Sequence, residues 1–439
     1  MSVPTNSNYD ALVIGAGAGG LCAAARLVHQ GYKVLVVERL GLVGGRASTR
    51  EVDGFKVNNG AIVVETGGIT EETFAEVGAT FDVRAPKVPI LYRIAGKDVD
   101  VTGGGWGMLL SKMTRSGAKL AQGIGAARND SGLPEDEITL DQWVSKYTKN
   151  EAVRGIFRNM SCSVFAVGSE DLPARVFLTY FTRKSAFKKF GFSAGGTIGI
   201  WESLAENIRS KGGDVWLSAA VTDLQVEYGK VVSATIERDG ESQTIGVRFV
   251  VSNIGTAATL DLIGEGNVDG DYAASVRKAD RPCSMITINF ASQKPLVETE
   301  GMLGFAKTKR LSYVANFTDL CPEMAPEGWH LYCGTSVPKP AIGDFDENAE
   351  IELLREDLLE EIPGFDQARI VSINIMRDGW PPQRAVAGFD LPQETPLENL
   401  WNVGDSVKEY ANGGITACAE TAKLVVEQAT QKFAVALDV

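Results

Sequence analysis

A glycine-rich stretch near the start of the chain has the residue types and spacing that phosphate binding requires. Gly15 allows a tight turn, Gly17 lets the backbone approach a pyrophosphate closely, and Gly20 lets a helix pack on a strand. The free N–H groups at the N-terminus of such a helix attract anions. We therefore predict a dinucleotide site whose first contacts are Gly15, Gly17, Ala18, Gly19 and Gly20.

The glycine motif indicates a dinucleotide site only when a strand precedes it and a helix and a second strand follow it. The segments around these glycines are predicted to form these elements. Residues 9–14 and 33–37 are apolar enough to form buried strands, and residues 21–30 are predicted to form a helix. Glu38 follows the second strand, 18 residues after Gly20. A carboxylate at this place accepts hydrogen bonds from the hydroxyls of a ribose.

A second glycine pair, Gly44 and Gly45, stands just after this unit, between Arg39 and Arg46. Here the sequence resembles the FAD enzymes with two dinucleotide-binding domains, which include amine oxidases, protoporphyrinogen oxidases and phytoene-type desaturases. The resemblance implies a loop along the flavin and its diphosphate, with Arg46 as a fixed cation for phosphate. It also implies a second segment near the flavin, formed by Asn59, Gly60 and Ala61.

Two later blocks of the sequence resemble the same family. Residues 193–255 are predicted to form a helix followed by several strands, which resemble the returning half of the FAD domain in phytoene-type desaturases. By this resemblance the backbone of Val221 meets the adenine, and Asn253 ends a strand that runs beneath the cofactor. Without the resemblance, Val221 is interpreted as a residue of a strand core.

The closing block, from Leu400 to about residue 431, resembles the family's last flavin motif. A strand ends in Gly404 and Asp405, and Gly414 and Ile415 then open a helix. The resemblance implies that Asp405 accepts a hydrogen bond from the ribityl chain. It also places the backbone N–H of Ile415 at the flavin edge that becomes negative on reduction, where a helix N-terminus is stabilising.

The closing block is more similar to phytoene-type desaturases than to amine oxidases. Amine oxidases usually have a tyrosine just before the closing glycine, where this sequence has Ala411, with Tyr410 one position away. Tyr410 is our candidate catalytic residue, either as a base or for orienting substrate, and its alternative is a packed wall tyrosine. Because no cysteine lies between Cys333 and Cys418, we expect FAD to be bound non-covalently.

Composition excludes several other classes of protein. A net charge of −13 argues against nucleic-acid binding, which needs a basic surface. Two histidines and six scattered cysteines argue against a metal site and favour a reducing cytoplasm. We expect neither a signal peptide nor a transmembrane segment. Basic-aromatic stretches at residues 103–128 and 173–201 leave peripheral membrane contact open, with a solvated helix face as the simpler interpretation.

The order of these blocks predicts an α/β protein in which a Rossmann-like FAD domain is interleaved with an α+β substrate domain that contains a mixed sheet. The predicted FAD domain is discontinuous and comprises residues 1–95, 193–255 and 377–439. The predicted substrate domain comprises residues 96–192 and 256–376. The second domain carries no motif of its own.

Three functions fit the sequence. The first is an FAD-dependent oxidoreductase that transfers hydride from a small lipophilic or cyclic substrate to flavin N5, as a C–C dehydrogenase or desaturase. The second is an FAD-dependent amine oxidase that releases hydrogen peroxide. The third is a flavin-dependent isomerase or binding protein without net redox turnover. A chain of 439 residues is short for a carotenoid desaturase, which favours a small substrate over a long polyene.

Overall fold

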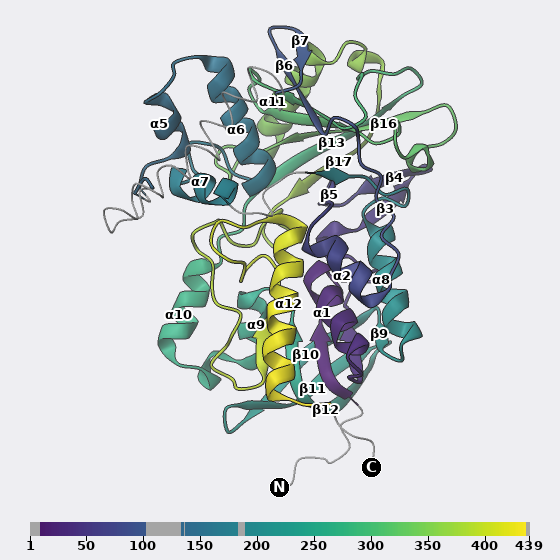
Figure 1. Cartoon of the computed structure of the whole chain (residues 1–439), viewed down its shortest axis with the longest axis vertical. Helices are drawn as coiled ribbons and strands as arrows, with labels where there is room; N and C mark the ends of the chain where they lie inside the picture. The colour runs from purple at the N-terminus through teal and green to yellow at the C-terminus, as the bar shows by residue number, and fades with distance from the viewer. Residues whose placement is uncertain (1–8, 102–132, 136, 183–188, 436–439) are drawn as a thin grey trace.

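The computed structural model describes residues 9–101, 133–135, 137–182 and 189–435, and these form two large β-sheets with helices packed on them (Figure 1). The basic-aromatic stretch at residues 103–128 lies outside the described residues, as do residues 183–188 of the second stretch. Within the described part of the chain, no helix is long and apolar enough to cross a membrane. All six cysteines are free thiols.

The first sheet has a parallel part in the order β9, β2, β1, β12, β18. These strands are β9 (Asp214–Trp216), β2 (Val34–Val37), β1 (Tyr9–Ile14), β12 (Glu241–Ser252) and β18 (Leu400–Asn402). In the centre, Leu12 pairs with Leu35 on one side and Val250 on the other. These strands carry continuous apolar runs because both of their faces are covered.

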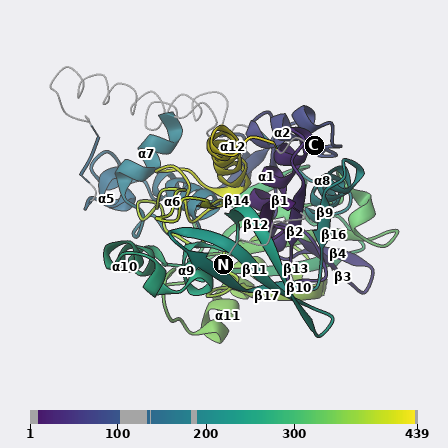
Figure 2. The same cartoon turned by 90° about the horizontal axis from the view of Figure 1, so that it is seen from below.

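Four helices cover one face of this parallel part, on the side opposite β10 and β11 (Figure 2). They are α1 (Ala18–His29), α2 (Ile69–Val77), α8 (Ile198–Ser210) and α12 (Gly414–Lys432). Small residues of α1 and α12 permit close packing, and the fully buried Trp201 of α8 fills the space beside them. The helices predicted after the first glycine motif, at the start of residues 193–255 and in the closing block are confirmed as α1, α8 and α12.

The other face of the first sheet is covered by an antiparallel meander and two short helices. The meander joins β10 (Ala219–Glu227) and β11 (Lys230–Arg238) to the first half of β12. Helices α9 (Thr256–Ile263) and α10 (Gly270–Ala279) share one apolar core with the meander and the parallel strands.

The second sheet is mixed and has the order β17, β13, β16, β15, β14, β6, β7, with only the β14–β6 pair parallel. Its strands are β17 (Arg369–Met376), β13 (Met285–Ser292), β16 (His330–Ser336), β15 (Leu311–Asn316), β14 (Met302–Phe305), β6 (Ile90–Ile94) and β7 (Lys97–Val99). Because strand side chains alternate between faces, Ile286 and Ile288 pack with α11 (Glu347–Glu361), and Met285 and Ala291 face the opposite side.

Three helices, one short hairpin (β3 and β4) and one short pair of strands distant in sequence (β5 and β8) lie beside the two sheets. The helices are α5 (Leu140–Ser145), α6 (Glu151–Phe165) and α7 (Ala174–Thr182). The short strands are β3 (Thr49–Val52), β4 (Phe55–Asn58), β5 (Val64–Glu65) and β8 (Phe190–Gly191). Single 3-10 turns are η1 (Gly45–Ala47), η3 (Glu265–Asn267), η4 (Pro322–Met324) and η5 (Phe365–Gln367).

The predicted fold class is confirmed by this pair of sheets, one with a Rossmann-like parallel part and one mixed. The division of the chain into two domains remains a proposal, and the sheets suggest different boundaries for it. Because β6 pairs with β14 in the second sheet, the first boundary moves from residue 95 to before Ile90. Because α9 and α10 pack with the first sheet, residues 256–279 move to the FAD domain.

Candidate cofactor and substrate site

A cavity of about 570 Å³ lies where the C-terminal ends of β1 and β2 meet the N-terminus of α12 and the second sheet. It contains most of the residues that the sequence assigned to the cofactor. Those that line it are Gly15, Gly17, Ala18, Glu38, Arg39, Gly44, Gly45, Arg46, Gly60, Ala61, Val221, Asn253, Asp405, Gly414 and Ile415. The fold therefore brings residues as far apart in the sequence as Gly15 and Ile415 into one continuous site, as the sequence predicted.

Two of the assigned glycines, Gly20 and Gly60, are packed too closely against backbone for any side chain. A Cβ atom on Gly20 would lie 2.0 Å from the carbonyl oxygen of Gly15, and one on Gly60 would lie 2.1 Å from that of Arg46. Three assigned glycines do not line the cavity itself: Gly19, Gly20 and Gly404. They pack behind it around the side chain of Asn253, which lies within 3.0 Å of where a Cβ on Gly17, Gly19 or Gly404 would be and 3.2 Å from one on Gly20.

Glu38 is held in place by the backbone at the end of β2. Its carboxylate accepts hydrogen bonds from the N–H of Ala16 at 2.7 Å and of Leu40 at 2.9 Å, one on each oxygen. The side chain is buried but lines the cavity, so its remaining lone pairs can accept hydrogen bonds from a ribose.

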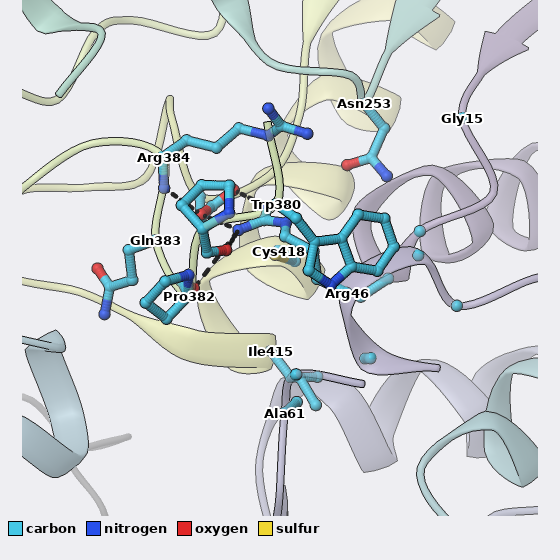
Figure 3. A pocket seen from close by; sticks show the side chains of 18 of the residues that line it. Gly15, Arg46, Ala61, Asn253, Trp380, Pro382, Gln383, Arg384, Ile415 and Cys418 are labelled. Atoms are coloured by element: carbon cyan, nitrogen blue, oxygen red, sulfur yellow. Dashed lines mark hydrogen bonds and ion pairs between the residues drawn. The ribbon is translucent and has the colours of Figure 1, made fainter. Parts of the chain in front are cut away.

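Arg46 and Asp405 pair with each other, which the sequence did not predict. The two terminal nitrogens of Arg46 donate to the two carboxylate oxygens of Asp405 at 2.8 and 2.5 Å (Figure 3). The backbone N–H of Arg384 also donates to Asp405, at 2.8 Å. Burial would raise the pKa of Asp405, but the charges of Arg46 and Arg384 hold it well below its usual range. Asp405 is therefore an ionised partner of Arg46.

Two further assigned residues, Asn59 and Tyr410, lie outside the cavity lining. Asn59 accepts a hydrogen bond from Arg50 and donates one to Ser48, and its carbonyl oxygen accepts one from the indole of Trp380 at 3.1 Å. Asn59 thus holds a wall residue in place instead of lining the cavity itself. Tyr410 is 36% exposed and does not line the cavity, so its position gives no support to a catalytic role.

The segment from Trp380 to Arg384 lines the cavity, although no sequence motif marked it. Arg46 donates to the carbonyl oxygen of Pro381 at 3.0 Å, which ties this segment to Asp405. Gln383 is buried and donates to the carbonyl oxygen of Val164 at 2.8 Å, while its side-chain oxygen receives no hydrogen bond from the described residues.

The opposite end of the cavity, which we call the chamber, is mostly apolar. Its walls come from α6, α7, the second sheet and the segment after β4. They include Ile62, Val164, Ala166, Tyr180, Met285 and Tyr313. Among the residues that the structure describes, Glu65 at the end of β5 is the one carboxyl group in the lining of the chamber.

Glu65 is anchored to the first turn of α12. One of its carboxylate oxygens accepts hydrogen bonds from the backbone N–H of Thr416, at 3.1 Å, and from the Thr416 hydroxyl. The other oxygen receives no hydrogen bond from the described residues and lies near Gly414. Burial raises the pKa of Glu65 against these hydrogen bonds. Sequence reasoning missed this residue because a single glutamate after an apolar run carries no motif.

The residues present fit an FAD molecule. Glycines that exclude any side chain surround the N-terminus of α1, and Glu38 offers an acceptor suited to a ribose. The buried side-chain oxygen of Gln383, a residue of the cavity lining, also has no hydrogen-bond partner among the described residues. Such groups are costly when buried unless a ligand satisfies them.

Comparison with known proteins identifies the family of the chain. A sequence profile described as flavin containing amine oxidoreductase matches residues 18–429. The chain belongs to this family. Members of the family bind FAD, usually without a covalent bond, and the chain is accordingly an FAD-dependent oxidoreductase, as the sequence predicted.

Solved structures share the fold over nearly the whole chain. An oxidoreductase from Methanosarcina mazei is 27% identical, covers 95% of this chain and 100% of its own, and has a TM-score of 0.80. A putrescine oxidase bound to putrescine is 15% identical, covers 96% and 98%, and has a TM-score of 0.69, which shows the fold alone.

Sequence relatives include an uncharacterized protein of Methanocaldococcus jannaschii, 23% identical over 92% of this chain and 94% of that protein. A zeta-carotene-forming phytoene desaturase of Myxococcus xanthus is 49% identical, but over only 15% of this chain and 13% of the enzyme. The predicted family, with its likeness to the desaturase branch, is confirmed.

Proposed function

We propose that this flavoenzyme removes hydride from a carbon atom of a small lipophilic or cyclic substrate, as a C–C dehydrogenase or desaturase. The observation that supports this proposal is the chamber: apolar and aromatic walls with one carboxyl group anchored beside the N-terminus of α12. Its walls suit a lipophilic molecule better than a highly charged one. The similarity to the Myxococcus xanthus desaturase agrees with this reaction class.

FAD supplies the acceptor for the hydride when it is bound. Making a carbon–carbon double bond also requires a base for the second hydrogen. We assign this role to Glu65, because one carboxylate oxygen is fixed by Thr416 and the other is left for the substrate. The raised pKa that burial gives Glu65 makes it a stronger base than an exposed carboxylate. This assignment replaces Tyr410.

The other carboxyl groups that line the cavity are already engaged at the cofactor end. Glu38 accepts two backbone hydrogen bonds, Asp405 pairs with Arg46, and Asp261 pairs with Arg277 at 2.5 Å. The free N–H groups at the start of α12, including that of Ile415, favour negative charge beside the chamber. We propose that these N–H groups stabilise the negative charge that the bound cofactor gains when it accepts hydride.

An amine oxidase that releases hydrogen peroxide is the second candidate function. Glu65 favours it as well, because a carboxylate in an apolar chamber can pair with an ammonium group. The putrescine oxidase fold agrees with this possibility without deciding it. A flavin-dependent isomerase or binding protein is a third candidate, for which we find no specific support.

The test is an anaerobic titration of the FAD-loaded chain with two panels, one of cyclic ketones and other lipophiles and one of lipophilic amines. Bleaching of the visible flavin absorbance by a ketone or lipophile supports the proposal. Bleaching by amines alone, with hydrogen peroxide formed on admitting air, would replace it with the second candidate. No bleaching, with binding still detected, would favour the third.

The variant Glu65→Gln tests whether Glu65 acts as the catalytic base or only binds substrate. In a desaturase, the variant should bind substrate but bleach at least about 100-fold more slowly, because general base catalysis contributes 10²–10⁴-fold. In an amine oxidase it should mainly weaken substrate binding. Glu72→Gln is the matched control, because Glu72 is an exposed residue of α2 and both variants should load FAD alike.

The absence of a nucleic-acid partner and a cytoplasmic location remain proposals that rest on the composition of the chain, and a small-molecule substrate is proposed from the family of the chain. Peripheral contact with a membrane is a further proposal, based on the basic-aromatic stretches. Its test is co-sedimentation of the full chain with anionic vesicles at low and high salt.

A further inference from the structure

The base proposed for the chamber limits the substrates on which it can act. A carboxylate such as Glu65, even when burial makes it a stronger base, removes a proton only from a carbon whose resulting negative charge is stabilised. A carbonyl group next to that carbon provides the stabilisation, because the charge moves to oxygen, where a hydrogen-bond donor can meet it. A chamber built for this reaction should therefore contain such a donor.

Two tyrosines, Tyr180 and Tyr313, line the chamber and carry hydroxyl groups that can donate. The other hydroxyl group among the described residues of the lining belongs to Ser163, and it donates to a backbone carbonyl oxygen one turn earlier in α6, at 2.8 Å. Tyr180 belongs to α7, and its ring packs on those of Phe165 and Phe181. Tyr313 belongs to β15, an inner strand of the second sheet, which gives its side chain a rigid base.

Tyr313 lies in a row of residues that project from one face of the second sheet. It pairs with Gly304 on one side and Thr335 on the other, and Gly304 pairs in turn with Tyr92. Residues paired directly across strands point to the same face, so the two tyrosines share it. The hydroxyl of Tyr92 donates to the side-chain oxygen of Asn159 at 2.9 Å, whereas Tyr313 lines the chamber. The row thus commits one tyrosine to the protein and presents the other to the cavity.

Tyr313 also packs close to the strand that carries Glu65. It shares one apolar cluster with Ile62 and with Phe190, the strand partner of Glu65. Burial raises the pKa of Tyr313 well above its ordinary value, so its hydroxyl keeps its proton at neutral pH and can donate it. A carboxylate base combined with a protonated donor in an apolar site is an arrangement that removes protons next to a carbonyl group.

We propose that Tyr313 donates a hydrogen bond to a carbonyl oxygen of the substrate, and that the substrate is accordingly a lipophilic or cyclic carbonyl compound. Glu65 takes a proton from the carbon next to the carbonyl group, and the negative charge reaches the oxygen held by Tyr313. The substrate then gives a hydride from the following carbon to bound FAD, and a double bond forms between the two carbons. One proton and one hydride leave, and the product is the α,β-unsaturated carbonyl compound. This inference rests on the reaction proposed above.

The first test measures binding of an enolate analogue and needs no turnover. The probe is 4-nitrophenol, because its phenolate carries negative charge on an oxygen attached to a flat ring, and its absorbance distinguishes phenolate from phenol. It is titrated into the FAD-loaded Glu65→Gln chain, in which the glutamine imitates the protonated base. Adding Tyr313→Phe should weaken phenolate binding by about 10- to 100-fold, the range for a lost hydrogen bond to a charged group. Nitrobenzene, which lacks the phenolate oxygen, should bind both chains alike.

Tyr92→Phe is the matched control, because it removes a buried hydroxyl from the same row of the sheet at a position that does not line the cavity. It should leave the affinity for 4-nitrophenolate unchanged. The pH at which the bound probe ionises should rise in Tyr313→Phe and stay constant in Tyr92→Phe, which a loss of packing alone would not produce. An equal loss of nitrobenzene binding in Tyr313→Phe, or a loss of phenolate binding in Tyr180→Phe in its place, would overturn the assignment.

The second test examines the substrate class with the cyclic ketones of the anaerobic panel and the same molecules carrying a methylene group in place of the carbonyl oxygen. We expect flavin bleaching by ketones only, and bleaching about 10- to 100-fold slower in Tyr313→Phe at equal FAD loading. Equal bleaching by the methylene compounds would overturn this inference and leave the C–C dehydrogenase standing. Bleaching by amines alone would instead overturn the reaction on which the inference rests.

Discussion

The two ends of the cavity are built in opposite ways. At the cofactor end, acidic groups are held by the backbone or by another charge, as Glu38 and Asp405 are, and the glycines leave no space for change. At the chamber end, the walls are apolar, and Glu65 keeps an oxygen without a partner. The cofactor end is therefore specified by close backbone packing, whereas the chamber end is specified by a few side chains that can vary.

Gly20→Ala should give the largest effect at the cofactor end. The new Cβ would lie 2.0 Å from the carbonyl oxygen of Gly15, so the turn and the N-terminus of α1 must separate. We expect a colourless chain that does not take up FAD, with a loss of stability of about 1–3 kcal/mol or more. Absorbance after purification and a thermal melt measure both effects.

Two alanine variants sharpen this comparison. Gly155→Ala would place a Cβ 1.7 Å from the carbonyl oxygen of Ala306 and so disturb α6 against β14, far from the glycine turn. It should destabilise the chain but leave a yellow protein. Gly266→Ala has open space around it and should change neither property. Loss of FAD in both Gly155→Ala and Gly20→Ala would show that the two ends are not separable.

Asp405→Asn should have the next largest effect, because it leaves Arg46 without its counter-charge. Removing one partner of a buried ion pair costs about 3–5 kcal/mol, and the Arg46 side chain, 23% exposed, places this pair at the lower end of that range. Asp344→Asn removes a fully exposed partner of Arg377 and should change stability much less, because solvent screens that pair. Chemical denaturation of flavin-free wild type, Asp405→Asn and Asp344→Asn measures the free energy of unfolding of each. Equal losses in the two variants would contradict the expected difference between the buried and the exposed pair.

The pH dependence of this pair follows from the lowered pKa of Asp405. A carboxyl group whose pKa is lower in the folded state stabilises the protein above its unfolded pKa of about 4 and loses that contribution as the pH falls toward the folded value. The difference in stability between wild type and Asp405→Asn should therefore be constant from pH 8 to pH 5 and shrink below about pH 4.

The sequence predicted the cofactor end better than the chamber for a physical reason. A glycine turn followed by a helix and a strand ending in Glu38 is a local pattern, and its spacing sets its geometry. The pair of Arg46 with Asp405 joins residues 359 positions apart, so each was assigned separately and the contact between them was missed. Arg384 follows two prolines and a glutamine and carries no pattern at all.

The chamber was not predictable because tertiary pairing places its residues. Glu65 stands in a two-residue strand, and only its pairing with β8 and its contact with Thr416, 351 positions away, bring it into the cavity. Tyr410 was chosen because it adjoins the closing motif. Ala411 takes a φ of 62° and is fully buried, while the tyrosine beside it is partly exposed, so proximity in sequence did not place Tyr410 in the cavity.

Glu65→Gln should have a modest effect on stability that depends on pH. Burial raises the pKa of Glu65, so the folded chain holds a proton that the unfolded chain releases as the pH rises above the ordinary carboxyl range. Wild type should therefore lose stability relative to the glutamine variant on going from pH 5 to pH 8. Melting temperatures of the flavin-free proteins at both pH values measure this, with Glu72→Gln as the control. A constant difference across the range would mean that Glu65 is ionised throughout.

Tyr410→Phe should have the smallest effect of all, because the ring remains and its hydroxyl group lies outside the cavity lining. We expect a change in stability within about 0.5 kcal/mol and an unchanged rate of flavin bleaching by any substrate found in the panels. The comparison with Glu65→Gln is decisive for the chamber. A large rate loss in Tyr410→Phe beside a normal Glu65→Gln would mean that the substrate reaches α12 from its other side, and the catalytic role would return to the residue that the sequence first suggested.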